Sequence, residues 1–128
     1  MFQLEMSVRD YECDLQGVVN NSVYQNYLEH GRHEFLLAKG VDFADLAAKG
    51  IDLMVLRVEL DYKAPLRPHD RFTVSCEVLR EGRIKLAFMQ KIIKADGTTI
   101  VEAKTIGAAI QGGRPMKSLA EIDALFGE

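Results

Sequence analysis

The sequence has no long hydrophobic run and no excess of basic residues. No apolar stretch in its 128 residues approaches the ~20 needed to cross a bilayer. The N-terminus alternates polar and apolar residues, so it lacks the continuous apolar core of a signal peptide. A formal net charge of −3 argues against a nucleic-acid partner, because phosphate binding needs a basic surface. These absences predict a cytoplasmic protein without a membrane or nucleic-acid partner.

Cysteines are few, and glycine motifs for nucleotides are missing. The two cysteines, Cys13 and Cys76, have no CxxC or other metal-ligand spacing, so no metal site is predicted. A disulfide between them is not expected in the cytosol. Cys13 is either a reactive thiol or, as is more common, a small half-buried residue at the end of a strand. No GxGxxG or P-loop is present, so nucleotide hydrolysis and nicotinamide binding have no support.

What is present is the composition of one globular domain. Hydrophobic residues make up 48% of the chain and charged residues 27%, which is ordinary for a folded domain. A chain of this length can bury ~65–70% of the surface that its unfolded form exposes. Internal repeats, low-complexity segments and linkers are missing from the sequence. We therefore expect residues 1–128 to form a single domain.

Hydrophobic periodicity predicts one strand followed by one long helix. Residues 2–8 alternate apolar and polar side chains, which is typical of a half-buried strand. From Asn21 the period becomes helical, with Asn20 or Asn21 as N-cap and Gly40 as the stop. The apolar positions on one face of this helix are Tyr24, Tyr27, Leu28, Gly31, Phe35 and Ala38.

A short second helix and four more strands complete the main pattern. The helix covers Phe43–Lys49, and the strands are expected at Leu56–Tyr62, Phe72–Val78, Ile84–Lys94 and Thr99–Ile110. Hairpin turn signals occur at 81–82 and 96–97. A terminal amphipathic helix is expected to contain Leu119, Ile122, Leu125 and Phe126. One long helix against an antiparallel sheet of about five strands is an α+β domain.

The segment with the clearest chemistry lies between the first strand and the long helix. Asp14 is followed by Gly17, and then by Asn20 and Asn21 at the helix start. A carboxylate can attack a carbonyl or activate water, and a helix start offers free N–H groups to a developing oxyanion. The alternative is structural: Asp14 caps backbone N–H groups, and Gly17 is an ordinary turn glycine. Capping is the expected duty of at least one asparagine.

This segment resembles a family motif. The segment resembles the motif of the hotdog-fold acyl-thioesterases, above all that of the 4-hydroxybenzoyl-coenzyme A thioesterase branch. It reads Asp14-x-x-Gly17-Val18-Val19-Asn20-Asn21-x-x-Tyr24-x-x-Tyr27-x-Glu29-x-x-Arg32. The Val19-Asn20-Asn21 part is also similar to acyl-ACP thioesterases. The strand and turn after the helix in that family resemble Tyr62-Lys63-Ala64-Pro65 and His69-Asp70. The predicted order of elements matches the family over essentially the whole chain.

The resemblance implies a sheet wrapped around the central helix and an active site at the interface of a homodimer, with assembly into a tetramer expected. It makes Asp14 the catalytic carboxylate, as nucleophile or general base. It makes the backbone N–H of Asn21 the oxyanion donor, with a contribution from the Asn20 amide. The implied reaction hydrolyses an acyl-CoA to a free acid and coenzyme A without a cofactor. Hydrolysis of acyl-ACP and acyl-thioester binding without hydrolysis are the alternatives.

Substrate contacts are expected on the loop, the helix and one hairpin. We expect Gly17, Val18 and Tyr24 to line the acyl site, although Tyr24 also lies on the apolar helix stripe. Coenzyme A carries phosphates, so cations are needed near the entrance of the site. The candidates are Arg80, Arg83 and Lys85 around the Gly82 turn, with Lys63 and Arg67 next, and a solvated basic hairpin is the alternative.

The chain departs from the family pattern in its histidines. Many relatives carry a histidine where this chain has Val18 or Asn21, so no imidazole within the motif can polarise the carbonyl. Glu29 and Arg32 lie three residues apart and could pair on the helix surface. The chain's own histidines are expected on the helix flank or in a turn, at His30, His33 and His69.

Overall fold

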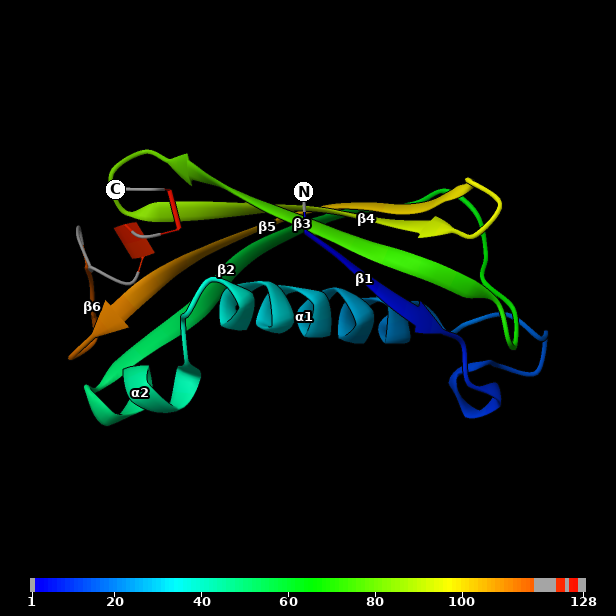
Figure 1. The fold of residues 1–128 in the computed structure, drawn as a ribbon, viewed down its shortest axis with the longest axis horizontal. Helices are drawn as coiled ribbons and strands as arrows, with labels where there is room; N and C mark the ends of the chain where they lie inside the picture. Colours follow the sequence, from blue (N-terminus) through cyan, green and yellow to red (C-terminus); the bar gives the residue numbers. More distant parts are fainter. Residues whose placement is uncertain (1, 117–121, 124, 127–128) are drawn as a thin grey trace.

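The chain folds as one long helix against one face of an antiparallel sheet (Figure 1). A computed structural model describes residues 2–116, 122–123 and 125–126. Helix α1 (Asn21–Ala38) lies under the sheet, and a short helix α2 (Phe43–Ala48) follows it. The predicted α+β class and the order of the main elements are confirmed. Among the described residues, no helix is long and apolar enough to cross a membrane.

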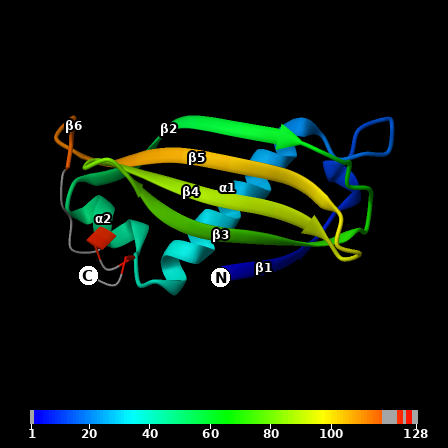
Figure 2. The same ribbon diagram turned by 90° about the horizontal axis from the view of Figure 1, so that it is seen from above.

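The sheet has the strand order β1-β3-β4-β5-β2, so β1 and β2 are its edges. Every pairing is antiparallel. The strands are β1 (Phe2–Ser7), β2 (Ile51–Tyr62), β3 (Arg71–Glu81), β4 (Lys85–Lys94), β5 (Thr99–Gln111) and β6 (Arg114–Pro115), which pairs with β5. Figure 2 shows α1 crossing the strands obliquely. Side chains at alternate positions of each strand therefore reach the helix.

Some strand bounds differ from those expected from periodicity. β2 already begins at Ile51, directly after the turn that ends α2. β4 begins at Lys85, because Ile84 belongs to the preceding turn and is partly exposed. The two glycines at 112–113 both have positive φ and turn the chain back into β6, an element that the pattern did not predict. The turns expected at 81–82 and 96–97 are confirmed.

Helix α1 approaches the sheet most closely at Gly31. A Cβ atom on Gly31 would lie 2.6 Å from Val74 Cγ1 and 3.3 Å from Gln90 Nε2. The buried Gln90 side chain donates through Nε2 to the carbonyl oxygen of Leu28 at 3.0 Å. The missing side chain at Gly31 lets the helix backbone approach β3 and β4, and the buried amide then fixes the helix to the sheet.

The buried face of α1 matches the predicted stripe except near its end. Its buried residues are Tyr24, Tyr27, Leu28, Gly31, Arg32, Phe35 and Leu36. The expectation for Ala38 is wrong, because Ala38 is exposed. Asn20 is the N-cap residue, but its side chain makes no capping hydrogen bond. The helix stop at Gly40, where φ is 84°, is confirmed.

The core consists of two clusters along α1. The first surrounds the N-terminal half of the helix and includes Tyr24, Tyr27, Leu28, Phe72 and Ile92. The second surrounds its C-terminal half and includes Phe35, Leu36, Leu46, Phe88, Ile122 and Leu125. Leu119, which the expected terminal helix also contains, lies outside the described residues. The helix thus separates an end near the Asp14 loop from an end near α2.

The sheet edge at β2 is long and apolar. β2 has 12 residues and pairs with β5 along only one side. The exposed fractions of Met54, Val55, Leu56 and Tyr62 lie between 49% and 52%. An exposed apolar edge strand presents unpaired backbone groups and is suited to pairing with another strand. This edge is therefore the part of the sheet best suited to a second chain.

Candidate active site

The Asp14 loop is a closed turn between β1 and α1. Cys13 and Val19 form an isolated antiparallel bridge at its base. Within the loop, the N–H of Asp14 donates to Val18 O at 2.9 Å, and the N–H of Gly17 donates to Asp14 O at 3.0 Å. Gly17 has a φ of 75°, a conformation that strains any residue with a Cβ. The glycine of the motif is therefore required by the shape of the turn.

The carboxylate of Asp14 is held through only one of its oxygens. Oδ1 accepts the N–H of Gln16 at 2.8 Å and that of Val18 at 3.4 Å. In the part of the chain that the structure describes, Oδ2 has no hydrogen-bond partner, and the residue is exposed. The structural role considered for Asp14 is thus present, because its side chain closes a turn. The same contacts orient the carboxylate and leave its second oxygen available to a ligand.

A buried tyrosine anchors this loop to α1. The Tyr27 hydroxyl is in the core and donates to Glu12 Oε1 at 2.8 Å. Burial, followed by this hydrogen bond to the carboxylate, raises the pKa of Tyr27, so the hydroxyl keeps its proton. Glu12 Oε1 also accepts the N–H of Arg9 at 2.8 Å, and Glu12 O accepts the N–H of Asn20 at 3.1 Å. Glu12 was not predicted as part of the site, because its contact with Tyr27 spans 15 residues of the sequence.

We expect Tyr27→Phe to lower the free energy of unfolding by about 1.5–3 kcal/mol, because the lost hydrogen bond is to a charged carboxylate. Urea denaturation followed by circular dichroism measures this change. Tyr11→Phe is the matched control, since Tyr11 is 76% exposed. Equal stability of the two variants would show that the Tyr27 hydroxyl does not hold the loop.

The start of α1 presents two free backbone N–H groups. The N–H of Val23 donates to Asn20 O at 3.0 Å, whereas those of Asn21 and Ser22 have no acceptor among the described residues. The Asn20 amide is turned toward Glu12 O, at 3.5 Å. Free N–H groups at a helix start, together with the helix dipole, favour an anion. Asn21 therefore has the free N–H that an oxyanion donor needs, while the Asn20 side chain points to the loop.

Within a single chain, the residues expected to contact substrate do not all lie close together. Tyr24 is buried, and its hydroxyl oxygen accepts the N–H of Leu66 at 3.0 Å, so it belongs to the core. Val18 is half-buried beside Asp14. Arg83 and Lys85 are exposed at the β3–β4 hairpin. The 11 residues of β3, about 35 Å of strand, separate this hairpin from the Asp14 end of the sheet (Figure 1).

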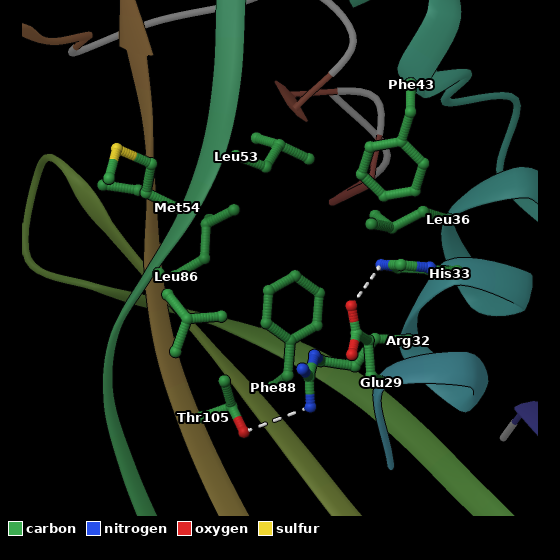
Figure 3. Close-up of a pocket in the computed structure, with 13 residues that line it drawn as sticks. Glu29, Arg32, His33, Leu36, Phe43, Leu53, Met54, Leu86, Phe88 and Thr105 are labelled. Atoms are coloured by element: carbon green, nitrogen blue, oxygen red, sulfur yellow. Dashed lines mark hydrogen bonds and ion pairs between the residues drawn. The ribbon is translucent and has the colours of Figure 1, made fainter. Parts of the chain in front are cut away.

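A cavity of about 120 Å³ lies between the second half of α1 and the sheet. Its apolar walls include Leu36, Phe43, Leu53, Leu86, Phe88 and Ala108. Figure 3 shows Arg32 reaching from α1 to Thr105 of β5 while Glu29 turns to His33. The Arg32 Nη1 atom lies 3.2 Å from Gln90 Oε1 and 3.4 Å from Thr105 Oγ1. Burial lowers the pKa of Arg32, although a guanidinium stays charged in proteins.

The pairing considered for Glu29 and Arg32 is wrong. Glu29 instead pairs with His33, at 3.7 Å, because Arg32 lies on the buried face of α1 and is directed to the sheet. An arginine on an apolar helix stripe is the sequence signal that could have marked Arg32 as an unusual buried residue. Asn21 and Glu29 lie eight positions apart, about 12 Å along the helix, so the cavity and the Asp14 loop lie at different ends of α1.

Cys13 has the features of a structural residue. Both Cys13 and Cys76 are free thiols. Burial, and then the neighbouring Asp14 carboxylate, raises the pKa of Cys13, while burial raises the pKa of Cys76 to about 12. A raised pKa disfavours the thiolate, which is the nucleophilic form. The two residues therefore lack the activated thiol that a cysteine nucleophile needs.

The chain is similar to known proteins over nearly its whole length. The family described as the thioesterase-like superfamily matches residues 8–124. A chloroplastic acyl-acyl carrier protein thioesterase of Arabidopsis thaliana is 36% identical over 126 residues, covering 97% of this chain and 66% of that protein. The acyl-CoA thioester hydrolase YbgC of Escherichia coli is 26% identical over 106 residues, covering 83% of this chain and 79% of that protein. The chain thus spans about two thirds of the length of the Arabidopsis relative.

Solved structures show the same fold. The 1,4-dihydroxy-2-naphthoyl-CoA thioesterase from Synechocystis superposes with a TM-score of 0.92 at 16% sequence identity. The alignment covers 99% of this chain and 96% of that one. At this identity the likeness concerns the fold alone, and it confirms the hotdog arrangement that the motif implied.

Proposed function

Because the chain belongs to the thioesterase-like superfamily, we propose that it hydrolyses acyl thioesters of coenzyme A to a free carboxylic acid and a thiol. The observation that carries this proposal is the state of the Asp14 carboxylate. One oxygen is fixed by two backbone N–H groups, and the other has no hydrogen-bond partner among the described residues, in a residue that is exposed. This arrangement supplies an oriented carboxylate for the chemistry. The free N–H groups of Asn21 and Ser22 supply donors for the oxyanion.

Two routes use these groups. As a nucleophile, Asp14 Oδ2 attacks the thioester carbonyl, the thiolate leaves, and water hydrolyses the resulting mixed anhydride. As a general base, Asp14 accepts a proton from a water that attacks the same carbon directly. In both routes negative charge develops on the carbonyl oxygen, where the helix start is favourable.

The proposed active unit is a homodimer joined along β2. An antiparallel, two-fold pairing near Leu56 places the Tyr62 end of one β2 beside the Ile51 end of the other. Tyr62 donates from its hydroxyl to Asn21 O at 3.3 Å, so the helix start and the Asp14 loop accompany that end. The cavity borders Leu53 near the opposite end of β2. Each Asp14 loop would therefore face the cavity of the other subunit.

This pairing also gives the basic hairpin a role. Arg83 and Lys85 follow the end of β3 that lies far from their own Asp14 loop, and Leu86 beside them borders the cavity. Across the dimer, the hairpin would lie near the other subunit's carboxylate. Arginine and lysine there can bind the phosphates of coenzyme A. The tetramer expected from the resemblance stays a prediction.

The proposed activity is tested by thiol release from coenzyme A thioesters of short, long and aromatic acids. We expect at least one of them to be hydrolysed with kcat/KM in the range of ordinary enzymes, about 10⁴ M⁻¹s⁻¹ or more. Tight acyl-CoA binding without turnover across the whole panel would instead support an acyl-thioester-binding protein.

Acyl-ACP is the second candidate substrate, because the Arabidopsis relative is named an acyl-acyl carrier protein thioesterase. The same acyl group is presented on coenzyme A and on ACP, and the two values of kcat/KM are compared. A basic hairpin that binds phosphates predicts faster hydrolysis of the coenzyme A thioester. A large preference for ACP would reassign the carrier and leave the reaction type unchanged.

A further inference from the structure

Arg32 is a buried cation with only uncharged partners. It is 8% exposed, and its Nη1 donates to the Gln90 amide oxygen and the Thr105 hydroxyl. Among the described residues, no carboxylate lies within ion-pair distance of the guanidinium; Glu29 nearby pairs with His33. A buried charge without a counter-charge is costly unless its donors are satisfied. The buried guanidinium of Arg32 is therefore unusual for a position in the core.

The remaining donors of Arg32 face the cavity. A guanidinium has five N–H groups, and the two protein acceptors are both served by one nitrogen. The other two nitrogens have no acceptor in the described part of the chain, and neither is sealed from solvent. Arg32 lines the cavity, so its free N–H groups are open to a ligand there (Figure 3).

The cavity suits a short acyl group with one polar atom. Its volume of about 120 Å³ is slightly below the ~150 Å³ of a cavity that takes up one benzene molecule. The walls are mostly apolar, and Arg32 and Thr105 form a polar floor. Glu29 is on the rim, where its side chain is 56% exposed and paired with His33. Water therefore screens its repulsion of an anionic ligand.

We propose that this cavity selects short acyl groups that carry an oxygen acceptor away from the thioester, bound by Arg32, which the buried Thr105 hydroxyl positions. The oxygen is that of a hydroxyl, a keto group or a carboxylate, all of which accept from a guanidinium. The proposal rests on the proposed function, since it assumes that the acyl part of a thioester enters the cavity. It assigns Arg32 a role in specificity in addition to its contacts with the sheet.

The test compares thioesters of equal chain length. The panel is butanoyl-, 3-hydroxybutanoyl- and succinyl-CoA, and the readout is the ratio of kcat/KM for an oxygenated acyl group to that for butanoyl. We expect a ratio of at least ~10 in the wild-type protein, because a hydrogen bond to a charged group is gained. A faster succinyl thioester would identify the carboxylate as the oxygen, and a faster hydroxybutanoyl thioester the neutral group. A wild-type ratio near one overturns the proposal.

Variants separate specificity from folding. Arg32→Met should bring the ratio to about one, and Arg114→Met, at an exposed arginine of β6, should leave it unchanged. A purely structural role for Arg32 lowers both rates together and keeps the ratio, which would overturn the proposal. If Arg32→Met does not fold, Thr105→Val decides, since it keeps the side-chain shape; its ratio should fall by several-fold, and an unchanged ratio would overturn the proposal.

A binding measurement distinguishes failure of this proposal from failure of the proposed function. Calorimetry with non-hydrolysable thioether analogues of butanoyl- and succinyl-CoA gives the same comparison without turnover. Hydrolysis without discrimination overturns the cavity proposal and retains the thioesterase. Preferential binding of the oxygenated analogue that Arg32→Met removes, without hydrolysis of any thioester, retains the cavity proposal and overturns the thioesterase.

Discussion

Asp14→Asn is expected to lower kcat for thioester hydrolysis by more than ~100-fold, because the amide can neither attack the carbonyl nor accept a proton from water. Asparagine keeps the Oδ1 acceptor for the N–H groups of Gln16 and Val18, so the turn should persist. Stability should stay within about 0.5 kcal/mol of the wild-type value. Thiol release under saturating substrate, with urea denaturation alongside, measures both quantities.

Asp10→Asn is the matched control for this variant. Asp10 is also exposed, begins a 3₁₀ turn (Asp10–Glu12) before the loop, and its side chain accepts one local backbone N–H, that of Tyr11. Its substitution should leave kcat unchanged. A wild-type rate in Asp14→Asn would refute the catalytic assignment and leave Asp14 as a residue that closes a turn.

Isotope labelling can then detect the nucleophilic route. In water enriched in ¹⁸O, a mixed anhydride that is hydrolysed at the Asp14 carbonyl leaves label in the Asp14 carboxyl group. A general base leaves that carboxyl unlabelled, as does an anhydride that is hydrolysed at the acyl carbonyl. Label found by mass spectrometry in the peptide that contains Asp14, after many turnovers, therefore identifies Asp14 as a nucleophile.

Leu56→Asp is expected to convert the proposed dimer to monomers and to lower activity by more than ~100-fold. Leu56 is 50% exposed in the single chain, so the charge should not disturb its core. At a β2–β2 interface, however, the new carboxylates would lie close together and lose their water, which is unfavourable. Light scattering coupled to size-exclusion chromatography gives the mass, and thiol release gives the rate.

Leu79→Asp is the control for this second variant. Leu79 lies on β3, three strands away from β2, and exposes 51% of its surface, nearly the same as Leu56. The substitution should retain both the dimer and the activity. An active monomer of Leu56→Asp would mean that one chain contains the complete site, and the interface proposal would fail.

The local pattern of apolar, polar and turn residues was sufficient to predict most of the fold. The alternation in Phe72–Val78 and the glycine turns at 82 and 97 specify strand faces and hairpins through neighbours in sequence. β2 shows the limit of this reasoning. Leu56 and Tyr62 alternate like buried residues, yet both are half exposed, because β2 is an edge strand in the single chain. Strand order, which decides this exposure, depends on contacts far apart in the sequence.

The site was predictable only where its residues are consecutive. Asp14, Gly17 and Asn21 fall within one short segment, so their types and spacing carry the signal. Arg32 finds its acceptors 58 and 73 residues along the chain, on β4 and β5. Helical periodicity can mark such a position as buried, but it contains no information about the strand that will lie opposite. The cavity therefore could not be predicted from one segment of the sequence.

The close packing of α1 on the sheet at Gly31 fixes the position of this helix. A Cβ atom at Gly31 would clash with Val74, and Gln90 donates to the Leu28 carbonyl oxygen, so the helix is held close to β3 and β4 at this point. In the proposed dimer, this fixed helix position also fixes the distance between the Asp14 carboxylate of one subunit and the acyl cavity of the other. Changes in preferred acyl length must then arise at the wall, at positions such as Leu53 and Leu86, and the chemistry at the helix start can remain untouched.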